Sequence, residues 1–399
     1  MLGARQVGKS YLLQKILKTH PGTLISLDDP LERQEAARDP VRYLERYFQP
    51  GKYLFIDEAA RVPEIFSAVK ILVDRNDPKP TGICLANSGN YLLLRKIKES
   101  LAGRVSLLPI YPLSWQEFSH SNKIPGLIDI IKNKKPKEIT YSSKLTEIRR
   151  LREERIIWGG FPSPALNSDT ETRMLWIRDY MRTYVLPLVV EQFNIRDSMA
   201  FEQLSRLLTL MTAQFLNTNK LAGNTGISQP TAMNYFYYLE AMMIARRAPI
   251  FFRNPTKRLV KHPKIHICDT LLINEAYGNN FSLHTALERG HLGALYESFI
   301  FNEIQKTLSN YDLFGECFTW RTQDGAEVDI VLSTGKGIIP LEIKWSKRLT
   351  KKDTSGIESF MNSYHEAKFG YIVYPGETIQ KITKNIFAIP DWWLFGCYT

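Results

Sequence analysis

The chain has 399 residues, more than one ordinary domain needs, so we expect two or three domains. Hydrophobic residues make up 44% of the chain and aromatic residues 12%, a composition that excludes an intrinsically disordered protein. The 52 Lys and Arg residues outnumber the 41 Asp and Glu residues, and the net charge of +11 favours DNA, another nucleic acid or another polyanion as partner. A basic surface that only faces solvent is the alternative.

The cysteines are isolated along the chain and show neither C-x-x-C nor metal-ligand spacing. They are Cys84, Cys268, Cys317 and Cys397. Such cysteines indicate reduced thiols and a cytoplasmic location. No apolar run approaches the ~18 residues that would span a bilayer, so we expect no membrane contact. We also expect no signal peptide, because the chain opens directly into a glycine-containing motif.

That motif, residues 3–10, reads Gly-Ala-Arg-Gln-Val-Gly-Lys-Ser and fits the phosphate-binding loop pattern G-x-x-x-x-G-K-[ST]. Its two glycines permit sharp turns that point backbone amides at phosphate oxygens. We expect Lys9 to reach the β- and γ-phosphates and the Ser10 hydroxyl to ligate Mg²⁺. Residues 11–17 have apolar positions at helical spacing, so the loop opens a helix N-terminus, which favours an anion. The predicted nucleotide contacts here are Gly3, Gln6, Val7, Gly8, Lys9, Ser10 and Tyr11.

A buried strand normally leads into such a loop. Only Met1 and Leu2 precede Gly3 in this sequence. We therefore expect the first strand of the sheet to be missing here, and a start further upstream is the interpretation we favour.

Residues 53–56, Tyr-Leu-Phe-Ile, form an apolar run that continues into Asp57 and Glu58. A buried parallel strand needs such a run, and the carboxyl end of the strand is where an α/β sheet holds its ligand. We expect Asp57 to hold Mg²⁺ and Glu58 to orient or deprotonate the attacking water. A strand that ends in a surface acidic pair is the alternative.

Residues 82–86 predict the next strand, and Ser88 and Asn90 follow it at positions that could sense a γ-phosphate. An ordinary polar turn has the same appearance. Arg104 could stabilise transition-state charge as an arginine finger, from the same chain or from a neighbouring subunit of a homo-oligomer. A surface charge at a helix end is the alternative.

Three stretches carry a family resemblance: GARQVGKS, LFIDEAARVPEIFSAVKILVDR, and ESLAGR followed by LPIYPLSWQEF. Over essentially its whole length the chain resembles a prokaryotic P-loop ATPase family of the AAA-related superfamily, whose members carry a C-terminal domain of unknown function with a nuclease-like core. The resemblance implies ATP as ligand and a parallel sheet in the order 5-1-4-3-2. This chain departs from the family at Ala60, where Gln is usual, and at Ala86-Asn87, where Thr-Gly is usual.

After a basic stretch at 132–137 and a helical pattern at 175–211, residues 216–239 predict a helix-turn-helix with a turn at Gly226 and a second helix capped by Ser228. In a DNA-bound winged fold the second helix would read the bases. Its predicted exposed residues are not basic: Gln229, Thr231, Asn234 and Tyr238. The predicted wing is basic: Arg253, Lys257, Arg258, Lys261 and Lys264. Contact with a protein partner, or a spacer role, is the alternative.

Near the C-terminus, residues 295–304 predict an amphipathic helix that carries Glu297, and residues 326–332 and 338–344 predict a β-hairpin. Period-2 alternation puts Glu342 and Lys344 on one strand face. With Asp329 opposite them, they form the D…(D/E)-x-K constellation of the PD-(D/E)XK nuclease fold. A hairpin with one exposed charged face is the alternative.

This constellation has a defined chemistry. Asp329 and Glu342, with help from Glu297, can hold Mg²⁺ between a phosphate and water, and Lys344 can lower the pKa of that water or steady the pentavalent charge. Many such folds bind without cutting, so the constellation leaves cleavage open. Basic residues after the second strand suit phosphate-backbone contact in either case.

Together the patterns predict an α/β protein whose nucleotide state controls a DNA-facing, nuclease-like domain. The predicted parts are a P-loop NTPase module with a parallel sheet (1–125), a basic linker with a lid-like helix (126–165), a helical winged-helix segment (166–275) and an α/β restriction-endonuclease-like domain (276–399). A Mg²⁺-dependent nuclease regulated by nucleotide and a non-enzymatic nucleotide-bound scaffold are the alternatives.

Overall fold

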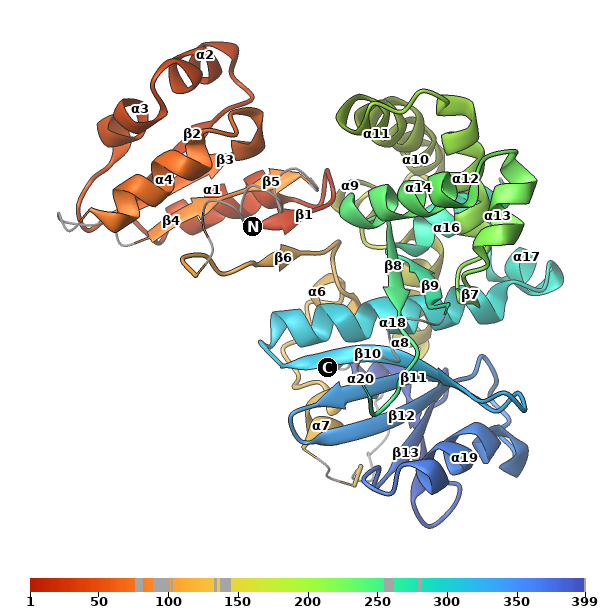
Figure 1. The fold of residues 1–399 in the computed structure, drawn as a ribbon. Coiled ribbons are helices and arrows are strands. Elements are labelled where there is room, and N and C mark those ends of the chain that lie inside the picture. Colours follow the sequence, from red (N-terminus) through yellow and green to blue (C-terminus); the bar gives the residue numbers. More distant parts are fainter. Residues whose placement is uncertain are drawn as a thin grey trace. The chain divides into compact units, whose positions relative to one another are not determined.

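The computed structural model describes residues 1–75, 82–88, 101, 103–132, 135–136, 145–254, 262–278 and 282–397. The chain forms two compact units, the first comprising Met1–Pro112 with Ala241–Met243 and the second comprising Leu113–Glu240 with Ile244–Thr399 (Figure 1). Part of the predicted site lies outside the described residues: Asn90 of the nucleotide contacts and Lys257, Arg258 and Lys261 of the wing.

The first unit is built on parallel strands. They are β1 (Leu2–Gly3), β2 (Gly22–Ser26), β3 (Tyr53–Asp57), β4 (Gly82–Leu85), β5 (Asn87–Ser88) and β6 (Pro109–Ile110). Two three-stranded sheets, β5-β1-β6 and β2-β3-β4, meet where Ala86 alone separates β4 from β5. The Ala86 N–H donates to the Ile56 carbonyl at 2.8 Å. If β4 and β5 are counted as one strand interrupted at Ala86, the strand order is β6, β1, β4/β5, β3, β2. This order corresponds to the order 5-1-4-3-2 that the family resemblance implies.

The expectation that the first strand is missing is wrong for this structure. Leu2 pairs with Asn87 on one side and with Pro109 on the other, and Gly3 pairs with Ser88 and Ile110. Leu2 and Gly3 suffice to form the strand because their backbone pairs with a neighbouring strand on each side. A Cβ on Gly3 would lie 2.5 Å from the Ile110 carbonyl oxygen, so only glycine fits there.

Helices flank these strands, as the red and orange elements of Figure 1 show. They are α1 (Lys9–Leu17), α2 (Pro30–Arg38), α3 (Pro40–Tyr47), the 3₁₀ turn η1 (Ala59–Arg61) and α4 (Ile65–Asp74). The Asp39 carboxylate caps α3 by accepting from the Arg42 N–H, and Pro40 occupies the first helical position. A residue before proline avoids the helical region, so the charged stretch after β2 folds as two helices.

The second unit begins with a largely helical part. Its helices are α6 (Trp115–Phe118), α7 (Gly126–Ile131), α8 (Leu145–Trp158), α9 (Pro162–Leu166), α10 (Thr170–Asp179), the π-helical turn η2 (Tyr180–Val185), α11 (Leu186–Phe193) and α12 (Ser198–Leu210). The predicted continuous helical pattern breaks at Asn194, whose φ of 50° is left-handed, and α12 restarts under an Asp197 cap.

The predicted helix-turn-helix corresponds to α13 (Thr218–Thr225) and α14 (Gln229–Ala241). Gly226 ends α13 with a φ of 68°, and the Ser228 hydroxyl accepts from the Thr231 N–H at 3.3 Å. Three short antiparallel strands accompany these helices in the order β7-β9-β8. They are β7 (Gln214–Phe215), β8 (Ala245–Ala248) and β9 (Lys264–Ile267).

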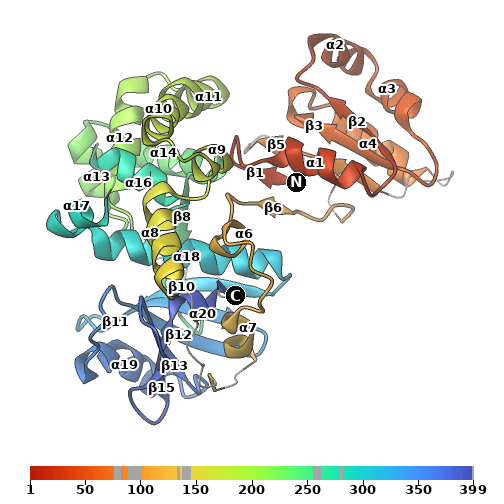
Figure 2. The same cartoon turned by 180° about the vertical axis from the view of Figure 1, so that it is seen from behind.

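The C-terminal part of the second unit is a six-stranded sheet in the order β10-β11-β12-β13-β15-β14, drawn in blue in Figures 1 and 2. The strands are β10 (Gly315–Arg321), β11 (Glu327–Thr334), β12 (Gly337–Ile343), β13 (Gly370–Tyr374), β14 (Gln380–Lys381) and β15 (Ile386–Pro390). The helices are α16 (Thr270–Tyr277), α17 (Leu283–Glu288), α18 (Leu292–Asn310), the 3₁₀ turn η3 (Lys351–Thr354), α19 (Ser355–Ser363) and α20 (Asp391–Leu394). The predicted hairpin is confirmed, because β11 pairs antiparallel with β12 from Ile330↔Leu341 to Thr334↔Gly337.

Hydrogen bonds join the helical part of this unit to its C-terminal part. The chain after β8 runs beside β10, where the Phe251 N–H donates to the Thr319 carbonyl at 2.7 Å. The buried Arg152 of α8 donates to the buried Asp391 carboxylate of α20 at 2.8 Å. The segment that the sequence predicts as a basic wing therefore begins beside the six-stranded sheet.

Candidate functional site

The loop between β1 and α1 turns as a phosphate-binding loop requires. Gln6 and Gly8 both have left-handed backbones, with φ of 60° and 92°. Helix α1 starts at Lys9 directly after Gly8, and the Leu12 N–H donates to the Gly8 carbonyl at 2.9 Å. The backbone amides of the loop and of the first turn of α1 are thus grouped at a helix N-terminus, the arrangement that attracts a phosphate.

Lys9 lies within this loop. Its Nζ donates to the carbonyl oxygens of Ala4 at 2.8 Å and Gly3 at 3.2 Å, and the residue is only 5% exposed. Burial lowers the pKa of Lys9 to about 8, although the negative charges of Glu58 and Asp57 oppose that shift. The hydrogen bonds of the ammonium among the described residues go to neutral carbonyls, so Lys9 can exchange them for bonds to an anion in the loop.

The ends of β3 and β5 bring the predicted catalytic and metal-binding oxygens beside the loop. The Ser10 hydroxyl donates to Asp57 Oδ2 at 2.5 Å, and the Ser88 hydroxyl donates to Glu58 Oε1 at 2.6 Å. A serine hydroxyl and an aspartate carboxylate in direct contact are close enough to share one Mg²⁺ between them. The donor set therefore fits Mg²⁺, which Ser10 and Asp57 would hold.

Sequence reasoning missed Asn87, the residue before Ser88. It is 1% exposed, its Oδ1 accepts from the Ala60 N–H at 3.4 Å, and its Nδ2 donates to the Ser88 carbonyl. These bonds link the end of β5 to the turn that carries Glu58. A polar residue directly after an apolar strand was the available signal.

The remaining predicted residues of this unit lie in varied surroundings. Val7 is buried, and Gln6 and Tyr11 are exposed, with Lys15 Nζ lying 5.5 Å from the centre of the Tyr11 ring. Arg104 Nε donates to Asp74 Oδ1 at 2.6 Å in a half-exposed ion pair. To act as an arginine finger, Arg104 would have to break its ion pair with Asp74.

The second unit brings the predicted nuclease residues together, and it adds Lys264 from β9. Lys264 Nζ lies 2.7 Å from Glu297 Oε1, 2.8 Å from Glu327 Oε1 and 3.1 Å from Asp329 Oδ1. Lys344 Nζ lies 2.7 Å from Glu342 Oε1. We call these six residues the lysine–carboxylate cluster: Lys264, Glu297, Glu327, Asp329, Glu342 and Lys344.

Lys264 was expected on an exposed wing, and that expectation is wrong, because the residue is 2% exposed. Burial alone would lower the pKa of Lys264, but the carboxylates of Glu297, Asp329 and Glu327 outweigh it and raise this pKa well above its ordinary value. Burial, together with the nearby Asp329, raises the pKa of Glu342 to about 7 against the opposing charge of Lys344. Within the described ranges, no group of three or more His, Cys, Asp or Glu side chains is arranged to hold a metal ion.

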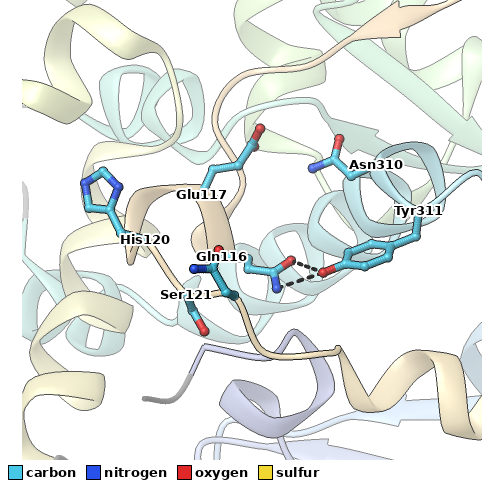
Figure 3. A pocket seen from close by; sticks show the side chains of 7 residues that line it. Gln116, Glu117, His120, Ser121, Asn310 and Tyr311 are labelled. Atoms are coloured by element: carbon cyan, nitrogen blue, oxygen red, sulfur yellow. Dashed lines mark hydrogen bonds between the residues drawn. The ribbon is translucent and has the colours of Figure 1, made fainter.

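An open groove of about 790 Å³ on the second unit is a different kind of surface. Figure 3 shows it between α6, the loop that follows α6, and the end of α18. Gln116 and Tyr311 bond each other across it, with Nε2 to OH at 3.0 Å, and Glu117 caps its own helix through Ser114. The groove contains no buried, unpartnered polar side chain among the described residues, so we assign no chemistry to it.

None of the described helices combines the length and the apolar character that a membrane crossing needs.

Three family models match successive parts of the chain. Residues 1–119 match an AAA domain, and residues 149–282 and 292–394 match two different domains of unknown function. Uncharacterized proteins of Mycobacterium tuberculosis and Mycobacterium bovis are each 26% identical over 98% of this chain and 79% of their own length. An uncharacterized protein of Methanocaldococcus jannaschii is 24% identical over 98% of this chain and 86% of its own length.

Among solved structures, the Bacillus subtilis DNA clamp loader delta protein aligns with a TM-score of 0.22 at 12% identity, over 74% of this chain and 94% of that one. A TM-score this low is not evidence of a shared fold or function. The AAA match coincides with the unit that holds the phosphate-binding loop and the Asp57–Glu58 pair. The chain thus carries an N-terminal AAA-type P-loop domain of the AAA-related ATPases, a domain type that indicates nucleotide binding.

Proposed function

We propose that this protein binds ATP with Mg²⁺ in its first unit and hydrolyses it. The observation that carries the proposal is the pair of contacts Ser10–Asp57 and Ser88–Glu58 beside the loop that holds Lys9. Three separate chain segments supply these groups, namely the start of α1, the end of β3 and the end of β5, and each group has the chemistry that phosphoryl transfer to water needs.

The residues have distinct roles in this proposal. Lys9 exchanges the carbonyls of Gly3 and Ala4 for oxygens of the β- and γ-phosphates. Ser10 and Asp57 hold Mg²⁺, which when bound neutralises phosphate charge. Glu58, released by Ser88, accepts the proton of the attacking water. Backbone amides of the loop hold the phosphates, and the exposed Gln6 and Tyr11 border the nucleotide.

Arg104 and Asn90 are further parts of this proposal. Arg104, once it leaves Asp74, would offset transition-state charge within the same chain or across a homo-oligomer interface. Asn90 would contact the γ-phosphate after β5.

The test is phosphate release from ATP by the purified chain, beside Lys9→Ala and Glu58→Gln. We expect Lys9→Ala to abolish binding of a labelled ATP analogue, and Glu58→Gln to keep binding but lose turnover by roughly 100-fold or more. Lys18→Ala, at the exposed end of α1, is the matched control and should behave as the wild type. Unchanged analogue binding by Lys9→Ala would refute the proposal. Binding without turnover in the wild type would favour the non-enzymatic scaffold.

We infer a second role for the other unit, namely that it engages DNA and that the nucleotide state alters this engagement. Exposed basic residues gather after β12 and support this role: Lys347, Arg348, Lys351 and Lys352. The element order around the helix-turn-helix, and the order α18-β10-β11-β12-α19-β13, are those expected of winged-helix and PD-(D/E)XK folds, and they support the proposed four-part division of the chain. The exposed face of α14 carries Gln229, Asn234 and Tyr237 but no basic residue, so we assign the phosphate contacts to the segment after β12.

Duplex DNA binding by fluorescence anisotropy tests this role. The pair Lys351→Glu and Lys352→Glu should weaken binding at least tenfold and flatten its salt dependence. The pair Lys123→Glu and Lys132→Glu makes the same charge change on exposed residues elsewhere in the unit and is the control. Equal losses in both pairs would indicate only a general charge effect and would remove the assignment.

A further inference from the structure

The lysine–carboxylate cluster has the carboxylates of a metal site but a different cation at its centre. Lys264 Nζ contacts one oxygen each of Glu297, Glu327 and Asp329 at 2.7–3.1 Å. The Lys264 side chain is 3% exposed, and those of Glu297 and Asp329 are 12% and 14% exposed. Three carboxylates from α18 and β11 therefore converge on one buried ammonium that water scarcely reaches.

We propose that Lys264 takes the place of a divalent cation in this nuclease-like core, so that the second unit excludes Mg²⁺ from the position where cleavage would require it. The proposal concerns the second unit alone and is independent of ATP binding by the first.

Each of the four carboxylates in the cluster already has an oxygen in contact with a lysine ammonium. Glu297 Oε1 and Asp329 Oδ1 accept from Lys264, and Asp329 Oδ2 accepts from the Ile343 N–H at 2.9 Å. Glu342 Oε1 accepts from Lys344. Among the carboxylate oxygens of the cluster, Glu342 Oε2 is the one that is buried without a hydrogen-bond partner within the described residues. This oxygen by itself does not make a magnesium site, since Mg²⁺ requires a near-octahedral set of oxygens.

A metal and the Lys264 ammonium also cannot share the site. An ion bound to Glu297 Oε1 and Asp329 Oδ1 at about 2.1 Å would lie within the space that Nζ fills. Two cations in contact in a poorly hydrated interior repel strongly. The residues therefore do not fit Mg²⁺ while Lys264 stays in place.

The backbone keeps Lys264 in place. It is paired on both sides, with Ala248 of β8 and with Phe215 of β7. The Phe215 ring lies 5.9 Å from Lys264 Nζ, near enough for a cation–π contact. The chain after β8 is in turn bonded to β10 through Phe251 and Thr319. The exclusion of the metal is thus built into the packing of the three-stranded sheet against the nuclease-like core.

Nearby charged groups do not replace this role. His266 Nε2 lies 3.9 Å from Glu297 Oε1, but the imidazole is fully buried and donates or accepts through Nδ1 with the Ser298 hydroxyl. Lys344 forms its ion pair with Glu342. Lys264 is therefore the one cation among the described residues that contacts Glu297, Glu327 and Asp329 together.

The test measures Mn²⁺ binding to the full, nucleotide-free chain by electron paramagnetic resonance. An Asp57→Asn background removes the metal ligand of the first unit. At about 1 mM Mn²⁺, in the range of weak carboxylate sites, we expect no ion in the second unit of this background protein. Addition of Lys264→Met should raise occupancy to about one ion per chain, and further addition of Asp329→Asn should remove that ion. Lys306→Met, which breaks the buried Lys306–Glu303 pair on α18, is the matched control and should bind no ion.

Two results would overturn the proposal. One is an ion in the Asp57→Asn protein that Asp329→Asn removes, because Lys264 would then not exclude the metal. This comparison retains Lys264, so it decides the question even when Lys264→Met does not fold. The other is a folded Lys264→Met protein, verified by circular dichroism, that gains no ion.

Discussion

At the scale of single residues, the first unit places Lys9 where its charge is costly without a nucleotide. The ammonium is 5% exposed and bonded only to the carbonyls of Ala4 and Gly3. A phosphate would add a direct charge-assisted hydrogen bond to the more distant negative charges of Glu58 and Asp57. Burial of this charge therefore costs stability in the folded protein, and the proposed nucleotide would reduce that cost.

A pH dependence of stability follows from Lys9. Its pKa is about 8 in the folded protein against 10.5 in the unfolded chain, so the unfolded chain binds more protons between these values. Stability then rises with pH across that window, and the cost of the buried charge is complete below pH 8. We expect the cost to fall by about 2 kcal/mol from pH 7 to pH 9.5 in the wild type, and not in Lys9→Met.

Hydrogen exchange of the β3 amides, which report opening of the first unit, measures this difference in the absence of nucleotide. Lys18→Met is the control, since Lys18 is exposed. Parallel pH profiles of the wild type and Lys9→Met would show that Lys9 does not carry the buried charge.

At the scale of elements, the buried ion pair of Arg152 and Asp391 connects α8 to α20. Their side chains are 4% and 0% exposed, and the Tyr296 hydroxyl of α18 donates to Asp391 at 2.7 Å. Three elements from distant parts of the chain thus share one carboxylate. The helix that the sequence predicts as lid-like belongs to the body of the second unit in this structure.

Asp391→Ala should therefore destabilise the second unit by about 3–5 kcal/mol, because it leaves the Arg152 charge buried and unpaired. Glu377→Ala is the control, since Glu377 pairs with Arg149 in a half-exposed contact worth at most about 1 kcal/mol. Urea unfolding followed by tryptophan fluorescence measures both, as Trp392 and Trp393 adjoin Asp391. A loss no larger than that of the control would mean that the pair contributes little.

Elements and site residues were predictable where the information is local. The loop at residues 3–10, the strand that ends in Asp57, and the β11–β12 hairpin each follow from spacing within one short segment. The Lys344–Glu342 contact follows from period-2 alternation on one strand.

Distant pairings were not predictable in the same way. Lys264 and Asp329 are 65 positions apart, and Arg152 and Asp391 are 239 positions apart. Spacing along the chain does not encode which elements pack together, so Lys264 counted as one of several basic wing residues. The short first strand was not predicted for a related reason, since it is stabilised by its pairing with β5 and β6 and not by its own length.

At the scale of the whole molecule, the proposed roles require that the nucleotide site and the DNA-engaging surface influence each other. A ligand shifts a conformational equilibrium only by its difference in affinity for the two states. ATP can therefore control DNA engagement only when the states that bind DNA well and poorly also differ in their affinity for ATP. If Lys264 excludes Mg²⁺ from the lysine–carboxylate cluster as proposed, ATP would control DNA binding and not DNA cleavage.

We expect a non-hydrolysable ATP analogue to change the affinity of the full chain for duplex DNA by at least about fivefold, a coupling of roughly 1 kcal/mol. Linkage requires that DNA change the affinity for the analogue by the same factor, so anisotropy with labelled DNA and with labelled analogue must agree. Lys9→Ala should retain DNA binding but lose the response to analogue. Asp329→Asn should keep both, since no metal acts in the cluster. Equal DNA affinity with and without analogue, under saturation of the nucleotide site, would separate the two units into independent binding modules.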